Sequence, residues 1–362
     1  MTKLVEKAFR HTLNSLAYHT NGSFSKPGLI YLKLTERCNF HCEHCDIWRS
    51  GSNQDLLVKD WKKIFQNLKT LVKKPTITVS GGEPLLYPGF WKLVGTCKYV
   101  GINISLNTNG SLINEVLAER LIQPPFAKVE ISLYTLRPEI QNKLRNTPLA
   151  FERASRALAA LTEAKKNFPT SKTNLLVAFL LTKINAREVE EFIKHFSKQG
   201  IWTTIQSLDT NVQALNQGEA FQEEKGLAAS DLWISDKKLV NATFDKLLAL
   251  KKEGYLVYNR LPQLNLMRSY YLEDWEKIKK LSCRAGHNNL IISKNGDTFF
   301  CFKGPRIGNL LNKDAKTIWR SPEAKKTRQK IKDCQRLCRV MNCNYSGGLL
   351  TKFTEHIKKP EA

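Results

Sequence analysis

The sequence predicts an α/β fold in which a partial (β/α)6, TIM-like barrel is followed by a small cysteine-rich domain of a hairpin and helices. Three observations predict it. Short β-branched runs alternate with longer amphipathic stretches from residue 29 to about residue 206, Asn295-Gly296 stands between two strand-like runs, and most of the nine cysteines gather in two groups. Strand, helix and strand at this rhythm indicate parallel pairing with right-handed crossovers.

The expected elements follow one another along the chain in six strand-helix units. Strands are expected at 29–35, 76–80, 102–107, 128–133, 174–182 and 202–207. Helices are expected at 59–73, 88–100, 112–122, 138–166 and 186–199. Further on, a polar stretch (216–226), two helices (236–253 and 271–281) and a hairpin within 289–302 are expected, the hairpin because Asn-Gly favours a tight two-residue turn.

These elements suggest a division of the chain into five parts. An N-terminal helical extension (1–28) precedes the barrel (29–207), and a helical connector (208–282) leads to the cysteine-rich domain (283–348) and a basic tail (349–362). With 362 residues the chain exceeds the size at which single cores stop growing, about 250 to 300 residues.

Composition narrows the class of protein. The chain is 42% hydrophobic and 25% charged, as in a globular protein, and it contains no repeated or biased segment. No run of roughly 18 apolar residues could span a bilayer, and the N-terminus reads as an amphipathic helix without a secretory apolar run. We therefore expect a cytoplasmic protein, in which nine cysteines favour metal or redox chemistry over disulfides.

The first cysteine group, Cys38, Cys42 and Cys45, follows the first expected strand, at the end where α/β barrels place their chemistry. Structural zinc takes four ligands, so a zinc site would need a further ligand such as His41 or His44. A 4Fe-4S cluster held by three thiolates instead keeps one iron open for a chelating cosubstrate.

The second strand runs into SGGEP (80–84). Glycines at a strand end allow a backbone to approach a ligand closely, and Glu83 beside them could accept hydrogen bonds from an ammonium group. By itself this motif is also compatible with a plain tight turn.

Together these residues resemble the radical S-adenosylmethionine (SAM) enzymes over about residues 29–206. The matching motifs are CNFHCEHC (38–45), SGGEP (80–84), TNG (108–110) and ISL (131–133). The resemblance implies that the three cysteines hold a 4Fe-4S cluster and that SAM binds beside it. The residues implied in SAM binding are Gly81, Gly82 and Glu83 at the amino group, Ser132 and Arg145 near the carboxylate or ribose, and Asn109 on the same face.

Two positions depart from the family pattern. His44 stands before the last cysteine, where an aromatic residue usually packs on adenine; a histidine can stack there, but it can also titrate. Tyr134 follows ISL, where many relatives carry an acidic residue, so any role of that acid in substrate handling is in doubt.

The C-terminal part resembles the SPASM or shortened twitch domains that bind auxiliary clusters in radical SAM enzymes. Its cysteines are Cys283, Cys301, Cys334, Cys338 and Cys343. A full SPASM domain has seven, so five imply one auxiliary 4Fe-4S cluster, held by Cys283, Cys301 and two of the last three. The alternative is a zinc-stapled knuckle, because small domains often need a metal to fold. Cys97, in an apolar helical stretch, is expected to be a core residue.

The resemblance implies reductive cleavage of SAM to methionine and a 5'-deoxyadenosyl radical, which takes hydrogen from a substrate. The substrate is expected to be a peptide or small metabolite, with the auxiliary cluster aiding oxidation or substrate binding and a flavodoxin or ferredoxin donating electrons. Relatives that act on peptides often carry a leader-binding domain, and only 28 residues precede the first expected strand. Alternatives are modification of a carbohydrate, lipid or cofactor precursor, or a non-catalytic metal-binding protein that binds nucleic acid.

Charge adds one indication about partners. The net charge is +24, and residues 313–339 carry ten Lys or Arg against three Asp or Glu. A basic surface concentrates anionic partners, including an anionic substrate or nucleic acid; the alternative is that the lysines only solvate helices. No aromatic-interleaved RNA motif supports the nucleic-acid alternative.

Overall fold

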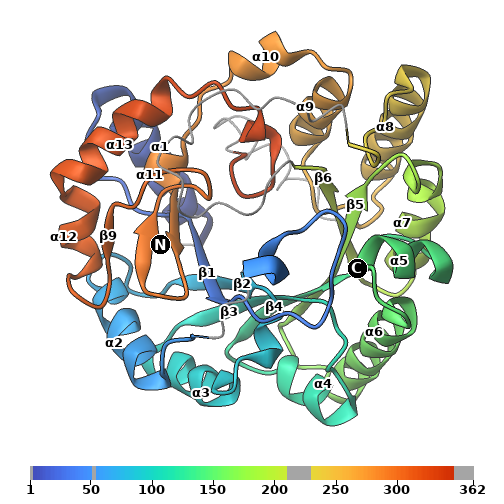
Figure 1. The fold of residues 1–362 in the computed structure, drawn as a ribbon, viewed down its shortest axis with the longest axis horizontal. Helices are drawn as coiled ribbons and strands as arrows, with labels where there is room; N and C mark the ends of the chain where they lie inside the picture. Colours follow the sequence, from blue (N-terminus) through green and yellow to red (C-terminus); the bar gives the residue numbers. More distant parts are fainter. Residues whose placement is uncertain (1–2, 51–53, 210–229, 346–362) are drawn as a thin grey trace.

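The computed structural model describes residues 3–50, 54–209 and 230–345 (Figure 1). The expected polar stretch at 216–226 and the expected basic tail at 349–362 lie outside these residues.

A parallel sheet in chain order forms the centre of the fold. Its first six strands are β1 (Leu29–Thr35), β2 (Thr76–Gly81), β3 (Asn103–Thr108), β4 (Phe126–Ser132), β5 (Asn174–Leu181) and β6 (Trp202–Ser207). Each pairs in parallel with the next. The sheet remains open, because within the described residues β6 and β9 stand at its two ends. The partial barrel expected from the strand-helix rhythm is confirmed.

Helices cover the outer side of this sheet and form an arc around it in Figure 1. They are α2 (Val58–Lys69), α3 (Phe90–Val100), α4 (Glu115–Leu121), α5 (Pro138–Arg145), α6 (Ala150–Asn167) and α7 (Val189–Ser197), with the short 3-10 turns η1 (Ile47–Ser50), η2 (Pro84–Leu86) and η3 (Ala186–Glu188). The single helix expected at 138–166 was wrong. Asn146 and Leu149 have φ of 43° and 59°, and Pro148 disfavours helical geometry in the residue before it, so the chain turns between α5 and α6.

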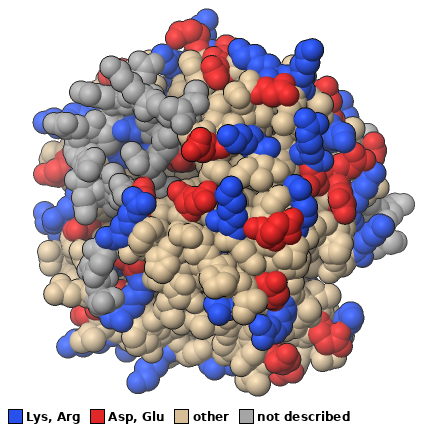
Figure 2. Space-filling view, turned by 45° about the vertical axis from the view of Figure 1, so that its right-hand side comes forward, with Lys and Arg blue, Asp and Glu red and all other residues tan. Residues whose placement is uncertain are grey.

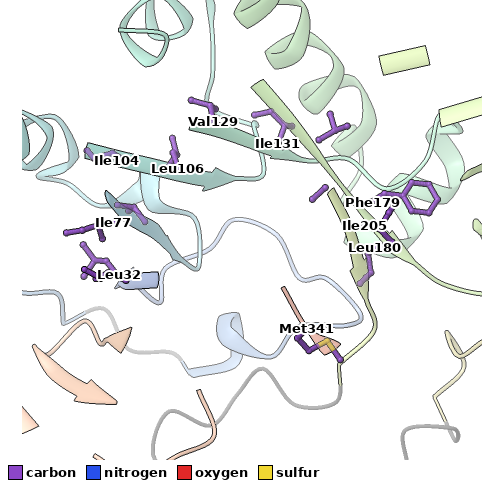
Figure 3. Close-up of a cluster of buried hydrophobic side chains, with 14 of the residues drawn as sticks. Leu32, Ile77, Ile104, Leu106, Val129, Ile131, Phe179, Leu180, Ile205 and Met341 are labelled. Atoms are coloured by element: carbon purple, nitrogen blue, oxygen red, sulfur yellow. The ribbon is translucent and has the colours of Figure 1, made fainter. Parts of the chain in front are cut away.

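The two faces of the sheet differ in polarity because strand side chains alternate. Ile77, Ile104, Leu106, Val129 and Ile131 point to the outer face and are buried in the main apolar core (Figure 3). The residues between them are threonine, serine, asparagine, lysine and glutamate, and they point inward. The interior of this barrel therefore carries many polar side chains beside apolar ones such as Leu176 and Trp202, unlike the packed apolar interior of a full TIM barrel.

The C-terminal part continues the same sheet. Its elements are α8 (Lys237–Lys252), α9 (Leu261–Tyr271), α10 (Trp275–Lys279), α11 (Ala285–Asn288), β7 (Asn289–Ile292), β8 (Asp297–Phe299), β9 (Gly308–Asn309), α12 (Ala315–Arg320), α13 (Pro322–Lys332) and η5 (Cys338–Val340). The expected hairpin is confirmed as the antiparallel pair β7 and β8, with Gly296 in its turn at a φ of 79°. Because β7 also pairs in parallel with β1, the hairpin extends the barrel sheet.

At the N-terminus, α1 (Lys3–Thr20) confirms the expected helix. Asn14 joins it to the segment before β1, donating to the carbonyl of Lys26 at 2.9 Å and accepting from its amide at 3.1 Å. No helix within the three described ranges is long and apolar enough to cross a membrane.

Candidate functional site

The loop after β1 brings three cysteines together. Cys38, Cys42 and Cys45 lie in one small cluster with Phe40 and Ala150, and the amide of Cys45 donates to the carbonyl of Cys42 at 3.2 Å. Burial raises the pKa of all three thiols, that of Cys38 to about 11. Buried thiols that resist losing a proton in water give it up to a metal cation, so this donor set fits an iron-sulfur cluster.

Arg145, at the end of α5, lies against these thiols. Its guanidinium stands 5.2 Å from the ring centres of Phe40 and Tyr134, and Nη1 donates to the Tyr134 hydroxyl at 2.6 Å. Burial opposes its charge, but Tyr134 and the cysteine thiols together raise the pKa of Arg145. A fixed positive charge therefore stands beside the place where thiolates would form.

Gly81 and Gly82 pack against the backbone of the cysteine loop, and their expected contact with SAM stays a prediction. A Cβ on Gly81 would lie 2.3 Å from the carbonyl oxygen of Thr35, and one on Gly82 would lie 2.1 Å from that of Arg37. The amide of Gly82 donates to Thr35 and that of Glu83 to Arg37, at 2.8 and 2.7 Å. The glycines thus let the end of β2 pack directly on the start of the cysteine loop.

The carboxylate of Glu83 is 1% exposed and already accepts three hydrogen bonds from the protein. Oε1 accepts from the Leu85 amide at 3.1 Å and the Thr108 hydroxyl at 2.7 Å, and Oε2 accepts from the Asn109 amide at 2.7 Å. A carboxylate offers about four acceptor positions, so about one remains for a ligand ammonium. Glu83 is first of all a clamp between the ends of β2 and β3.

Asn109 extends this clamp to the cysteine loop. Its Nδ2 donates to Asn39 Oδ1 at 2.9 Å, and its Oδ1 accepts from the Ser111 amide at 2.8 Å. Asn39 lies between Cys38 and Cys42 and donates in turn to the Ser111 hydroxyl at 2.9 Å. The sequence signal for Asn39 was its place inside the cysteine motif, but its partner could not be read from the chain.

The two departures from the family pattern contact each other. His44 Nε2 lies 3.2 Å from the Tyr134 hydroxyl, the same oxygen that accepts from Arg145. Desolvation and then the charge of Arg145 lower the pKa of His44 to about 3, which keeps the ring neutral. Ser132, two residues before Tyr134, ends β4 on the same side, and its carbonyl accepts from Gln141 at 3.1 Å. His41, by contrast, is exposed and lies edge-on to Trp48.

The five C-terminal cysteines form a second group. Burial and then charges within the group raise the pKa of Cys283 to about 11 and of Cys301 to about 12, while burial followed by Asp209 raises that of Cys343 to about 12. Burial, then Asp209, and then Cys283, Cys301 and Cys334 raise the pKa of Cys338. These mutual effects indicate that the five thiols lie near one another.

In the described ranges, no group of three or more His, Cys, Asp or Glu side chains is close enough to hold a single metal ion. Cys97 lies apart from both groups, 1% exposed in the apolar core, as expected.

A cavity of about 870 Å³ fills the inner side of the barrel. Its walls include the inward side chains of β1 to β6 and, from the C-terminal part, the segment Met341–Cys343 and Tyr345. Exposed lining residues stand at the amino ends of the strands, as Thr76 and Asn174 do, so the cavity opens there. The Glu83 and Asn109 clamp stands at the other, carboxyl end of the strands.

The basic residues of the stretch 313–339 are only partly exposed on α13. Lys325, Lys326 and Lys330 are exposed, but Arg328 is 2% exposed and packs on Phe300 and Trp319. It donates to the carbonyls of Gly286 and Trp319, both at 2.8 Å. On the face that Figure 2 shows, basic and acidic side chains are interspersed, so no continuous basic field appears there.

Comparison with protein families agrees with this geometry. Residues 32–201 match the model of the Radical SAM superfamily, and residues 283–344 match that of SPASM, an iron-sulfur cluster-binding domain. The two matched segments contain both cysteine groups.

Individual proteins are similar over shorter stretches. The chain is 29% identical over 174 residues to an AdoMet-dependent heme synthase of Methanosarcina barkeri, covering 47% of this chain and 46% of that protein. It is 31% identical over 186 residues to the mycofactocin maturase MftC of Mycobacterium tuberculosis, covering 50% and 45%. The matches thus span about half the length of these curated relatives.

One solved structure has a similar fold over nearly the whole length of both chains. Native anSMEcpe with bound AdoMet and the Cp18Cys peptide has a TM-score of 0.60 at 18% identity, covering 91% of this chain and 96% of that one. At this identity the likeness concerns the fold.

Proposed function

This chain belongs to the radical SAM superfamily and carries a SPASM domain, and from this premise we propose that it cleaves SAM reductively and abstracts hydrogen from a substrate in the barrel cavity. Its cofactors are a 4Fe-4S cluster, SAM and an auxiliary iron-sulfur cluster. The match to an iron-sulfur cluster-binding domain favours iron-sulfur over zinc at the C-terminal cysteines. The observation that carries the proposal is the placement of the two cysteine groups on one barrel. The three-cysteine loop is bonded to the carboxyl ends of β2 and β3, and Cys343 of the second group lines the cavity on the inner side of the same sheet.

The residues of this chain have distinct roles in the proposal. Cys38, Cys42 and Cys45 would hold the first cluster, which with SAM supplies a 5'-deoxyadenosyl radical for hydrogen abstraction. Gly81 and Gly82 keep the cysteine loop packed on β2, while Glu83 and Asn109 hold that loop against β3. Ser132 and His44 would border SAM, and Arg145 would balance the negative charge of the thiolates.

The auxiliary site would be held by four of Cys283, Cys301, Cys334, Cys338 and Cys343. Cys343 lines the cavity, so a substrate there would lie next to this site. That contact supports a role of the auxiliary cluster in accepting an electron or in anchoring the substrate.

The substrate is a small molecule or a short part of a peptide. The cavity of about 870 Å³ lies within the usual range of small-molecule sites, about 300 to 1,000 Å³. The peptide seen with anSMEcpe supports the peptide alternative, and the heme synthase supports the small-molecule one. A flavodoxin or ferredoxin in the cytoplasm is the proposed electron donor, and the net charge of +24 suits an acidic donor protein.

Iron content and SAM cleavage test the proposal. Anaerobic reconstitution should give about eight irons per chain if both clusters are 4Fe-4S. With a strong reductant the protein should form 5'-deoxyadenosine and methionine. Replacing Cys38, Cys42 and Cys45 together by alanine should remove about half of the iron and all SAM cleavage.

Cys97→Ala is the matched control, because Cys97 is a buried cysteine outside both groups. It should keep the iron and the activity. Intact wild-type protein with full iron that forms no 5'-deoxyadenosine would contradict the proposal.

A further inference from the structure

Several buried polar atoms in the barrel cavity have no partner within the protein. Among the cavity-lining residues, the orphaned atoms include Asn107 Oδ1, Glu130 Oε1, Thr204 Oγ1 and Ser207 Oγ. These four atoms have no part in the proposed binding of SAM or of the clusters. Buried polar atoms are seldom left unpaired in native proteins, so each of these atoms needs water or a ligand.

Two of these atoms stand side by side. Asn107 on β3 and Glu130 on β4 are direct register partners in the parallel sheet, and both side chains line the cavity. Both orphaned atoms are oxygens that can only accept hydrogen bonds once Glu130 is ionised. This part of the wall therefore calls for a ligand group that donates.

Only one of the two carboxylate oxygens of Glu130 has a hydrogen-bond partner in the protein. It is 4% exposed, and its Oε2 accepts from Lys128 Nζ at 2.8 Å. Burial opposes the charge of Lys128, but Glu130 raises its pKa, so the two groups form an ion pair. Lys128 satisfies one carboxylate oxygen and leaves the other, Oε1, without a partner in a residue that lines the cavity.

The position of Glu130 suits a reacting substrate. Glu130, Asn107, Tyr31 and Cys343 line the same cavity. Asn107 also precedes Thr108, whose hydroxyl donates to Glu83. A group bound at Asn107 and Glu130 would therefore share the cavity with Cys343 of the proposed auxiliary site.

We propose that Asn107 and Glu130 bind a protonated primary amine of the substrate, an inference that rests on the function proposed above. An ammonium group has three donors, enough for Glu130 Oε1 and Asn107 Oδ1 together, and it adds a charge-assisted bond to the carboxylate. A hydroxyl has only one donor and no charge. The amine enters from the open amino ends of the strands, past Tyr258, whose ring lies 5.7 Å from Lys128 Nζ.

The amine could belong to a lysine side chain of a peptide or to an aminated small molecule. Two probe pairs distinguish these sources. The first is acetyl-Gly-Lys-Gly-amide against the same peptide with norleucine, and the second is glucosamine against glucose. Binding is measured by equilibrium dialysis on the anaerobically reconstituted full chain with SAM present.

At least one amine probe should bind about tenfold more tightly than its neutral counterpart, because a hydrogen bond to a charged group is lost in the neutral one. Glu130→Gln should remove this preference. Asn107→Ala, which deletes an acceptor without changing charge, should reduce it several-fold. Glu190→Gln, at a surface ion pair with Lys194 and Lys246, should keep it. Iron content checks that each variant is folded.

Amine probes that bind no better than their neutral counterparts, or do not bind, overturn the assignment, as does an unchanged preference in folded Glu130→Gln. SAM cleavage by the same wild-type preparation separates this outcome from failure of the proposed function. If 5'-deoxyadenosine forms, only the amine site is wrong.

Discussion

Replacing Glu83 should damage folding before it damages SAM binding. Three donors converge on its buried carboxylate: the Leu85 amide, the Thr108 hydroxyl and the Asn109 amide. Leaving a buried donor unpaired costs about 1 to 3 kcal/mol. At the lower end for each donor, Glu83→Ala should lower the free energy of unfolding by about 3 kcal/mol in the absence of SAM.

Two further variants grade this effect. Glu83→Gln keeps one carbonyl oxygen as acceptor but turns an NH2 toward a donor, so it should cost less than the alanine variant. Thr108→Val removes one of the three donors and leaves the carboxylate in place, and it should cost about 1 kcal/mol. Urea unfolding of the three variants, measured alongside wild type, gives the order.

A purely ligand-binding role predicts the reverse pattern. If Glu83 mainly held the SAM ammonium, Glu83→Ala would leave unfolding unchanged and weaken SAM by about 1 to 3 kcal/mol. Wild-type urea stability in Glu83→Ala would therefore refute the clamp.

The other predictions concern packing and pH. Gly82→Ala should prevent normal folding of the cysteine loop, because its Cβ would lie 2.1 Å from a backbone oxygen, and the reconstituted protein should contain less iron. Gly95→Ala in α3, with nothing within 4 Å of the added Cβ, should instead stabilise the protein by about 0.5 to 1 kcal/mol. Equal effects of the two substitutions would contradict the packing argument. Arg328→Leu should lower the melting temperature, since it leaves the Gly286 and Trp319 carbonyls without donors, whereas Lys326→Leu on the exposed side of α13 should change stability by no more than about 0.5 kcal/mol. Burial lowers the pKa of His287 to about 3, so the unfolded chain binds a proton that the folded chain does not as pH falls below about 6.5. Between pH 6.5 and 5.5, wild type should therefore lose about 1 kcal/mol more unfolding free energy than His287→Asn, and parallel pH profiles would show that His287 does not titrate in this way.

Local patterns were enough to predict most of the barrel. The strands at 29–35 and 202–207 have the bounds expected from their alternating residues. Helix α9 was missed, because buried residues such as Gln263, Ser269 and Tyr270 lie among its apolar ones and blur the stripe that marks an amphipathic helix. The break between α5 and α6 was missed because two residues in left-handed conformation, Asn146 and Leu149, leave little trace in periodicity.

The site motifs could also be recognised in the sequence, but the contacts that their residues make in the fold could not. Gly81 and Gly82 were expected to let the backbone approach a ligand, and the structure shows in addition that they make room for the backbone of the cysteine loop. Arg328 belongs to the basic stretch 313–339, and it is buried under two aromatic rings. In both cases the neighbour that explains the residue comes from another segment, which a reading along the chain does not include.

The sequence by itself determined the strand-helix order, the two cysteine groups and the family, because these depend on residue types at short spacing. Only the tertiary structure decided which distant groups meet: Glu83 with Asn109, His44 with Tyr134, β7 with β1, and Asn107 with Glu130 inside a polar cavity. Hydrogen bonds act over about 3 Å, and the pairing of the strands sets which residues come that near. Many sequences can share one strand order while their inward side chains differ. The chemistry of the cavity therefore depends on which inward side chains the strand pairing brings together.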